Sequence, residues 1–359
     1  MSARRIGDPV QFGLSLIFTL TLGAAGGLAA FQLHLPLALL LGALLTTGTA
    51  AALEWRPFGQ RILLPMKLRS AFVPVIGVSI GGAFTPDVAG QAMDWGPSLL
   101  ALFVFLPVLH AVGYLIYRRG GLPRIESYFG AAPGGLIETV QMGEEAGGDA
   151  RLMTVLQFLR LILTILFVPL IFVVLTGGAV GSASGATLPA AHVALTPVEV
   201  MFLIAVGALG VGVGRLLRFP AYIMTGPILF SALAHGAGLV HGVPPAWLVG
   251  LTQVVVGCGL GARFSGVDHR LLLRAIRLAS LNAVVALVVT FGFAAALAPW
   301  VGEPMAAVFL AYAPGGLAEM SLVALSLNMS VVYVTVHHVL RIVLSVFAAR
   351  LGMRYLRRG

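Results

Sequence analysis

Long apolar runs separated by short polar stretches recur along the whole chain. In the first half we predict helical segments over 10–33, 36–53, 68–84, 97–117 and 150–175. In the second half we predict them over 197–217, 220–234, 245–264, 271–299 and from 330 onward. A helix that crosses the bilayer core needs about 20 predominantly apolar residues, so this pattern predicts an all-α polytopic membrane protein.

Two short stretches interrupt the apolar pattern and are nearly identical: APGGLIE at 132–138 and APGGLAE at 313–319. Pro-Gly-Gly cannot continue a helix, because proline lacks a backbone donor and glycine favours turned backbone. Broken backbone at membrane depth is tolerated only where protein or a cavity covers it. We therefore take these stretches as the candidate centre for binding a substrate or ion, with the residues Pro133, Gly134, Gly135, Glu138, Pro314, Gly315, Gly316 and Glu319.

The order of segments repeats along the chain. A shift of 181 residues pairs Pro133 with Pro314, Glu138 with Glu319, and Arg160 with Arg341, with no gap between them. Glycines earlier in each half match at similar shifts, as do the Gly-x-x-x-Gly-x-x-Phe stretches at 77–84 and 257–264. The repeat predicts one duplicated membrane domain. Its halves are residues 1–175 and 197–359, and a Gly/Ala/Ser-rich linker over 176–196 joins them.

Composition agrees with a membrane protein. The chain is 59% hydrophobic and only 10% charged, with a mean hydropathy of +1.00, whereas soluble domains carry about 25% charged residues. Its net charge of +9 sits in short loops between apolar segments. Nucleic acid is not expected as a partner, since no basic helix with stacking aromatic residues is present. A single cysteine, Cys258, excludes an intrachain disulfide and a cysteine-based metal cluster, and we expect no cofactor.

The basic loops also predict a topology. With Arg4 and Arg5 inside, every basic loop falls on the inner side only if each Pro-Gly-Gly stretch enters the membrane and returns. This predicts two inverted-topology repeats, each of about five transmembrane helices plus one re-entrant hairpin, with both termini cytoplasmic. A broken helix that crosses the membrane remains the alternative for each hairpin. Inverted repeats with interrupted helices at the midplane are a recurring plan of secondary transporters.

Each hairpin is followed by a helix with one polar face. The spacing of 3, 3 and 4 residues places all the polar positions of a helix on that face. An arginine near the centre of a membrane helix costs about 2.5–3.5 kcal/mol on insertion scales, so we expect both arginines to face a carboxylate, a carbonyl or an anionic ligand. Glu138 and Glu319 are the nearest candidate partners. The two faces are Thr154, Gln157, Arg160 and Thr164, and Thr335, His338, Arg341 and Ser345.

Two interpretations of these residues are open. In the functional one, the helix N-termini and the arginines hold an anion, and the glutamates bind Na⁺ or carry a proton. In the structural one, Glu138–Arg160 and Glu319–Arg341 are ion pairs that only fix each hairpin. His338 is a candidate proton relay, although a histidine on a packed helix face is more often simply hydrogen-bonded.

The two motifs, the arginine helices that follow them and the Gly-x-x-x-Gly-x-x-Phe stretches resemble the AbrB-type membrane protein family. Its members are built from an AbrB duplication and are also labelled ammonia monooxygenase-like proteins or regulators. The resemblance covers nearly the whole chain and implies a bacterial inner-membrane protein labelled as a regulator of gene expression. This family is distinct from the small soluble DNA-binding AbrB proteins. More distantly, the plan is similar to cation/proton antiporter and anion transporter folds, a likeness that fixes no substrate.

The sequence is therefore compatible with three functions. The first is a secondary active transporter of a small anionic or zwitterionic solute, coupled to H⁺ or Na⁺. The second is a membrane-embedded sensor or regulator that binds a ligand without moving it. The third is a membrane enzyme such as an oxygenase subunit, which the absence of a nucleophile–base arrangement disfavours. The expected partners are the lipid bilayer, the solute and the coupling ion, and a homo-oligomer is left open.

Overall fold

The structure is a computed structural model that describes residues 9–84, 90, 92–176, 180 and 195–356. These residues form fourteen α-helices and short 3-10 turns, with no strand among them. The predicted linker over 176–196 lies almost entirely outside the described residues. So do residues 1–8 and 357–359, whose arginines contributed to the predicted orientation of the termini.

The described residues of the first half include seven α-helices. Each long helix begins and ends within three residues of its predicted segment, and the stretch around Pro133 separates two short helices as expected. The helices are α1 (Pro9–Gln32), α2 (Ala38–Ala52), α3 (Met66–Gly81), α5 (Gly96–Arg119), α6 (Arg124–Ala131), α7 (Leu136–Glu145) and α8 (Ala150–Thr176).

The described residues from 195 to 356 include seven further α-helices. The matched helices α2 and α10 have 15 residues each, α3 and α11 have 16, α6 and α13 have 8, and α7 and α14 have 10. The helices are α9 (Pro197–Leu216), α10 (Tyr222–Gly236), α11 (Ala246–Gly261), α12 (His269–Leu297), α13 (Met305–Tyr312), α14 (Leu317–Ser326) and α15 (Val331–Leu356).

Seven of the described helical segments are long and apolar enough to cross a membrane, over α1, α5, α8, α9, α11, α12 and α15. Their outer faces carry exposed apolar side chains: on α1, Val10, Ile17 and Leu28 are each at least 60% exposed. Exposed apolar faces of this kind are stable in contact with lipid hydrocarbon chains and unfavourable in water. The chain is therefore a multi-pass membrane protein. The helices α2, α3 and α10 are shorter, at about 22–24 Å for a rise of 1.5 Å per residue.

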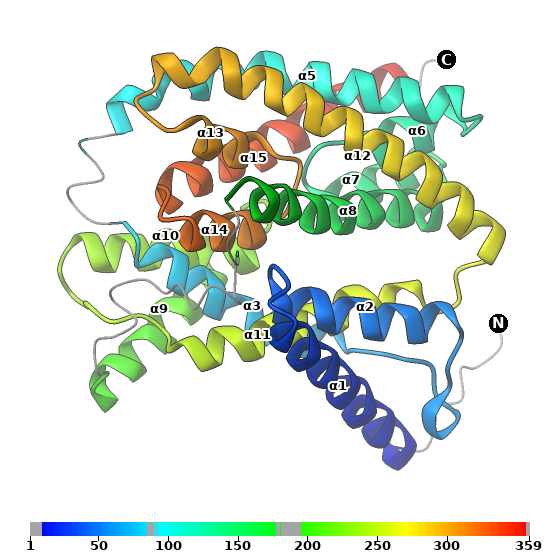
Figure 1. The fold of residues 1–359 in the computed structure, drawn as a ribbon, viewed down its shortest axis with the longest axis horizontal. Coiled ribbons are helices and arrows are strands. Elements are labelled where there is room, and N and C mark those ends of the chain that lie inside the picture. The colour runs from blue at the N-terminus through cyan, green and yellow to red at the C-terminus, as the bar shows by residue number, and fades with distance from the viewer. Residues whose placement is uncertain (1–8, 85–89, 91, 177–179, 181–194, 357–359) are drawn as a thin grey trace.

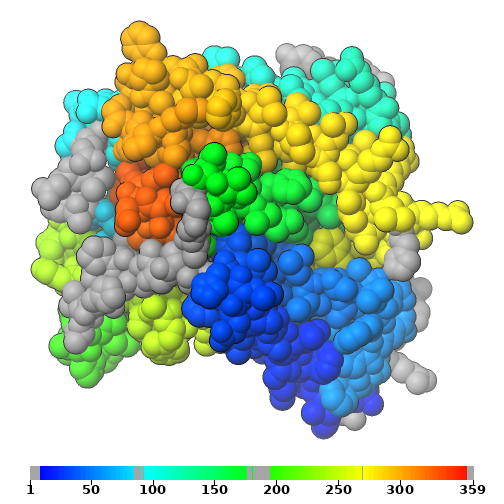
Figure 2. All heavy atoms as spheres, in the orientation of Figure 1, coloured from blue at the N-terminus to red at the C-terminus, as the bar shows by residue number. Residues whose placement is uncertain are grey.

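The helices divide into two groups (Figure 1). A six-helix group contains α1, α2, α3, α9, α10 and α11, and an eight-helix group contains α5 to α8 and α12 to α15. Packing is extensive within each group, whereas α3 makes the main helix contacts between the groups, with α14 and α15. Side chains fill the space between the ribbons, so the two groups form one continuous body (Figure 2). Both Pro-Gly-Gly hairpins and both arginine helices belong to the eight-helix group.

Glycines bring helix backbones into contact at equivalent crossings in the two halves. A Cβ on Gly26 of α1 would lie 2.7 Å from the carbonyl oxygen of Gly42 on α2. A Cβ on Gly210 of α9 would lie 2.8 Å from the carbonyl oxygen of Gly226 on α10. Close backbone approach at small residues is a common way to pack helices in membranes.

The α9–α10 crossing offers a test with a control two residues away. Gly210→Ala places a methyl group 2.6 Å from the Pro227 nitrogen, whereas Gly212→Ala meets nothing within 4 Å. We expect Gly210→Ala to cost about 1–3 kcal/mol through overpacking and to lower the melting temperature of the purified protein by a few degrees. Gly212→Ala should leave the melting temperature unchanged or raise it slightly. Equal melting temperatures for the two variants would contradict this crossing.

Candidate functional site

The Pro-Gly-Gly stretches break two helices, as the sequence predicted, but with different backbones. Helix α6 ends at Ala131 and α7 begins at Leu136, while α13 ends at Tyr312 and α14 begins at Leu317. Gly135 adopts the left-handed conformation, with φ 65°, a region that favours glycine. Its match Gly316 is extended, with φ −77° and ψ 148°. The same sequence therefore makes two differently shaped tips.

Arg160 of α8 holds the first break. Its Nη1 donates hydrogen bonds to the carbonyl oxygens of Ala131 at 3.1 Å and Ala132 at 2.6 Å. The last carbonyls of a helix have no partner within the helix, and they are costly to bury unpaired. Arg160 itself is buried, so its charge and the end of α6 satisfy one another inside the protein.

Arg341 of α15 does the same for the second break. Its guanidinium donates to the carbonyl oxygen of Ala313, and its Nη2 donates to that of Gly315 at 2.6 Å. Ala313 is the match of Ala132 at the shift of 181 residues. Among the predicted partners of the arginines, carbonyl oxygens are therefore the ones that the structure provides.

Gln157 and His338 support the same hairpins one turn earlier. Gln157 Nε2 donates to the carbonyl oxygen of Phe129 at 2.7 Å and to Thr139 Oγ1 at 2.8 Å. His338 Nε2 donates to the matched carbonyl oxygen of Leu310 at 2.9 Å, while its Nδ1 accepts from Arg341 Nη2 at 3.0 Å. A carbonyl only accepts, so this arrangement selects the neutral Nε2–H tautomer. With both ring nitrogens occupied, the geometry favours the hydrogen-bonded interpretation of His338 over a proton relay.

The glutamates do not pair with the arginines. Within the described part of the chain the one ion pair joins Arg56 to Glu54, so the structural interpretation by Glu–Arg pairs is wrong there. Glu138 is half-buried and its Oε1 accepts from the backbone N–H of Ala221, at the start of α10, at 3.3 Å. The spacing along the helix had placed the arginines on the correct face but could not identify their partners.

Glu319 is more deeply enclosed than its match. It is only 6% exposed, and its carboxylate folds back over Gly316, where a Cβ would collide with it. The opposite charge whose field reaches Glu319 is Arg69, in the first turn of α3. In the sequence, Arg69 simply follows a basic loop and carries no signal of this role. Both hairpin glutamates thus have partners in the six-helix group.

The remaining polar positions have more local roles. Thr154 donates to the carbonyl oxygen of Ala150 in its own helix at 2.6 Å, and Thr164 to that of Arg160 at 2.9 Å. Thr335 lies 2.9 Å from the hydroxyl of Ser321 and so links α15 to α14. Neither of these hydrogen bonds of Thr154 and Thr335 goes to the Pro-Gly-Gly backbone.

Each hairpin tip packs against the arginine helix of the other half. A Cβ on Gly134 would lie 3.1 Å from Ser345 Oγ of α15, and a Cβ on Gly316 would lie 3.3 Å from Leu161 of α8. Ser345 is one turn beyond Arg341, and Leu161 directly follows Arg160. The structure therefore brings the candidate residues of both halves into one interlocked centre.

This centre retains unpaired polar atoms. A buried polar atom without a hydrogen-bond partner is unusual in a native protein and calls for a ligand, a water or an ion. The arginine charges also act on one another, with no carboxylate at ion-pair distance from either within the described residues. The site is thus positively charged and contains hydrogen-bond donors and acceptors without partners. Its unpaired atoms are Gln157 Oε1, Arg160 Nε, Arg341 Nε and Ser345 Oγ.

A second buried polar cluster lies beside the site, around His337. Its Nδ1 donates to the carbonyl oxygen of Tyr333 at 2.8 Å, and its Nε2 lies 2.8 Å from Ser98 Oγ of α5. Tyr312, at the end of α13, donates to the carbonyl oxygen of Ser98. The sequence carried no signal for this cluster, because Ser98 lies more than 200 positions before Tyr312 and His337.

A carboxyl group lies at the outer end of this cluster. Glu303 precedes α13, and burial raises its pKa, an effect that hydrogen bonds with the Trp95 and Ser330 side chains partly offset. The Trp95 ring packs edge-on against Tyr333 with centroids 5.4 Å apart. Aromatic and polar side chains therefore connect a half-buried carboxyl to the interior of the eight-helix group.

Comparison with known proteins gives consistent matches. The family model described as "Transition state regulatory protein AbrB" matches residues 49–357. The chain is 29% identical over 342 residues to the "Putative regulator AbrB" of Escherichia coli strain K12, covering 93% of this chain and 92% of that protein. It is 26% identical over 289 residues to the "Uncharacterized protein YhjN" of Bacillus subtilis strain 168, covering 75% and 73%.

The role of Arg341 can be tested by hydrogen exchange. Arg341→Gln removes charged hydrogen bonds to two backbone carbonyls, each worth about 1.5–3 kcal/mol. We expect amide exchange in α13 and α14 to accelerate about tenfold or more in mass-spectrometric measurements, since each 1.4 kcal/mol is a factor of ten. Arg350→Gln, at an exposed position of the same helix, is the matched control. Unchanged protection of the hairpin in Arg341→Gln would contradict this role.

Proposed function

We propose that this chain, which belongs to the AbrB family of membrane proteins, is a secondary active transporter of a small anionic or zwitterionic solute coupled to H⁺ or Na⁺. The observation that carries the proposal is the interlocked centre. Two buried arginines there hold broken helices by their carbonyl ends and leave polar atoms unpaired. Charged residues inside a membrane domain are expensive and are functional by default.

Matched geometry in the two halves supports a duplicated, inverted architecture. The arginine–carbonyl contacts, the contacts to Phe129 and Leu310, and the glycine crossings all recur at equivalent positions. We take each half as five crossing helices and one re-entrant hairpin, because this topology leaves every basic loop on one side. The protein would then lie in the inner membrane, with both termini on the cytoplasmic side. Transporters with inverted repeats bind their substrates at such a central interface.

The charge of the centre favours a solute with a negative group. Arg160 and Arg341 are bound only by neutral groups in the described residues, so their positive field is not cancelled locally. A guanidinium pairs well with a carboxylate or phosphate. The Nε atoms of both arginines are unpaired donors. A carboxylate or phosphate of the solute would supply the missing acceptor.

The two glutamates are the best candidates for the coupling ion. Each is carried by a hairpin of the eight-helix group yet interacts with the six-helix group, Glu138 with Ala221 of α10 and Glu319 with the field of Arg69 of α3. Binding of a proton or Na⁺ would weaken these contacts between the groups. Since the groups otherwise share few helix contacts, ion binding would then change how readily one moves against the other.

A membrane-embedded sensor is the second candidate. The E. coli relative is named a regulator, and the family description also refers to regulation. The same centre would then bind its ligand without moving it across the membrane. Binding without flux is the property that separates this function from transport.

Transport can be tested in liposomes with purified protein and a panel of small dicarboxylates, inorganic phosphate and zwitterionic amino acids. We expect one class to show counterflow, and a gradient of H⁺ or Na⁺ to drive its accumulation. Specific binding without flux of any panel solute in either direction would favour the sensor.

Glu138→Gln/Glu319→Gln should abolish gradient-driven accumulation of that solute, because neither amide binds a proton or Na⁺ as a carboxylate does. Solute exchange without a gradient should persist, since the arginines remain. Glu144→Gln, an exposed position on the same helix as Glu138, is the control and should behave like the unmodified protein. Accumulation that survives the double substitution would refute the coupling role.

A further inference from the structure

A cavity of 280 Å³ lies in the six-helix group, where the start of α3 meets the end of α11. Two arginines line it: Arg69 from the first turn of α3, and Arg263 from the short 3-10 turn that follows α11. Small-molecule pockets typically measure about 300–1,000 Å³, so this cavity suits a small ligand. The other lining residues carry no charge and are Ile62, Leu63, Leu64, Met66, Gly259 and Ala262.

The two arginines are positioned by contacts across the seam between α3 and α11. A Cβ on Gly259 would lie 3.2 Å from Arg69 Cδ, so the missing side chain of this glycine leaves room for the arginine. Arg263 Nη2 lies 4.0 Å from the sulfur of Met66, one turn before Arg69 on α3. The Arg263 guanidinium also lies over the ring of Phe158 on α8, with its Cζ 5.3 Å from the ring centroid. The charges of the two arginines act on one another across this small space.

The charge of this cavity is not balanced by a neighbouring acid. No acidic residue lines it, and neither arginine forms an ion pair within the described residues. Glu319 acts on Arg69 only through its field. Arg69 Nε is buried and has no hydrogen-bond partner, although a buried donor without a partner is costly and rare in native proteins. An anion in the cavity would supply that partner and reduce the repulsion between the two arginines.

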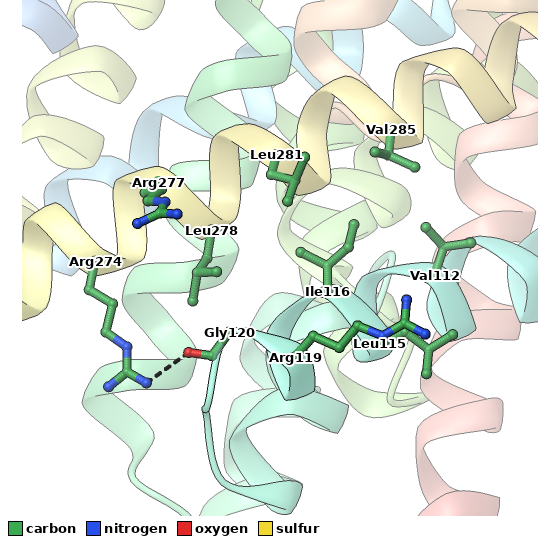
Figure 3. A pocket seen from close by; sticks show the side chains of 10 residues that line it. All are labelled: Val112, Leu115, Ile116, Arg119, Gly120, Arg274, Arg277, Leu278, Leu281 and Val285. Atoms are coloured by element: carbon green, nitrogen blue, oxygen red, sulfur yellow. Dashed lines mark hydrogen bonds between the residues drawn. The ribbon is translucent and has the colours of Figure 1, made fainter.

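Arginines around another pocket do not gather in this way. Arg119, Arg274 and Arg277 line a pocket of 760 Å³ between α5 and α12, but their guanidinium groups point apart (Figure 3). Arg274 is bound instead to the carbonyl oxygen of Gly120 at 2.8 Å (Figure 3). None of their nitrogens is among the buried unpaired atoms of the described chain. The enclosed, unpaired nitrogen of Arg69 is therefore what marks the smaller cavity as a binding site.

We propose that the cavity between α3 and α11 binds a small free anion through a carboxylate or phosphate group, with Arg69 Nε–H donating to it and Arg263 closing the cavity beside it. A guanidinium is well matched to the oxygens of either group. Met66, the first residue of α3, also lines the cavity, so the partial positive charge of the helix N-terminus adds to the attraction. This site is distinct from the unpaired atoms around Arg160 and Arg341.

The cavity adjoins the interlocked centre. Arg69 is the residue whose charge reaches Glu319 of the second hairpin, and Phe158, under Arg263, lies two residues before Arg160 on α8. Basic loops flank the cavity, and the predicted topology places these loops on the inner side. In the proposed transporter the site would hold the anion on the inner side of the centre. That role rests on the proposed function, whereas binding itself does not.

Isothermal titration calorimetry of the full chain in detergent tests the proposal, with inorganic phosphate and succinate as probes at constant ionic strength. We expect saturable binding of at least one probe. Arg69→Gln should weaken it about tenfold or more, because a charged hydrogen bond is lost. Lys67→Gln removes the same charge from the same turn of α3, at an exposed position that does not line the cavity, and should leave the affinity nearly unchanged.

A second variant keeps the proposal testable if Arg69→Gln fails to fold. Arg69→Lys retains the positive charge and most of the aliphatic stem but has no Nε–H and no planar fork. It should weaken binding measurably, although less than Arg69→Gln does. Arg263→Gln should weaken binding as well, because it removes the second charge at the cavity.

Several outcomes would overturn the proposal. One is the absence of saturable binding of either probe. Full affinity in Arg69→Gln or Arg69→Lys would place the anion elsewhere, and equal weakening by Arg69→Gln and Lys67→Gln would indicate a general effect of surface charge. Binding of phosphatidylglycerol micelles but of neither free probe would indicate a lipid site. Arg69-dependent binding without flux in liposomes would support this site and count only against the proposed transport.

Discussion

Broken backbone inside a membrane must find hydrogen-bond partners within the protein, and the rest of this structure depends on that requirement. The two Pro-Gly-Gly stretches expose helix-end carbonyls in the middle of the eight-helix group. Arg160 and Arg341 reach them from α8 and α15, and the carbonyl oxygens in turn make two buried charges tolerable. Neither partner would be stable there alone. The two buried arginines and the two Pro-Gly-Gly breaks therefore stabilise one another, because each supplies the hydrogen-bond partner that the other needs.

Similar contacts occur at matched positions of the two halves with different chemistry. Gln157 and His338 bind matched carbonyls, one with an amide and the other with a neutral imidazole. Gly135 is left-handed where Gly316 is extended, and Glu138 is half-buried where Glu319 is enclosed. The scaffold thus tolerates divergence as long as each hairpin is held. In the proposed transporter, such asymmetry would allow the two carboxylates to differ in their affinity for the coupling ion, which a site with strict symmetry could not provide.

Most helices of this fold were predictable, since apolar run length and proline or glycine breaks are local signals that burial reinforces. The polar faces of α8 and α15 followed from their 3, 3, 4 spacing. Tertiary partners did not follow. The helical spacing was compatible with Arg160 binding either Glu138 or a backbone carbonyl, and no local sequence feature distinguished between these partners. Arg69, Ser98 and Tyr312 join their clusters across large sequence separations, where periodicity carries no information.

The packing of the first hairpin tip on α15 has a consequence for biosynthesis. Gly134 of the first tip packs on Ser345, which is 211 residues later in the chain. Ribosomes add about 5–20 residues per second, so the first hairpin waits about 10–40 s for its supporting helix to be made. During that interval its glycines and the carbonyl ends of α6 have only Arg160 and neighbouring helices of the first half to shield them. A nascent chain of this design needs protection, by the insertion machinery or by lipid, until its last helix enters the membrane.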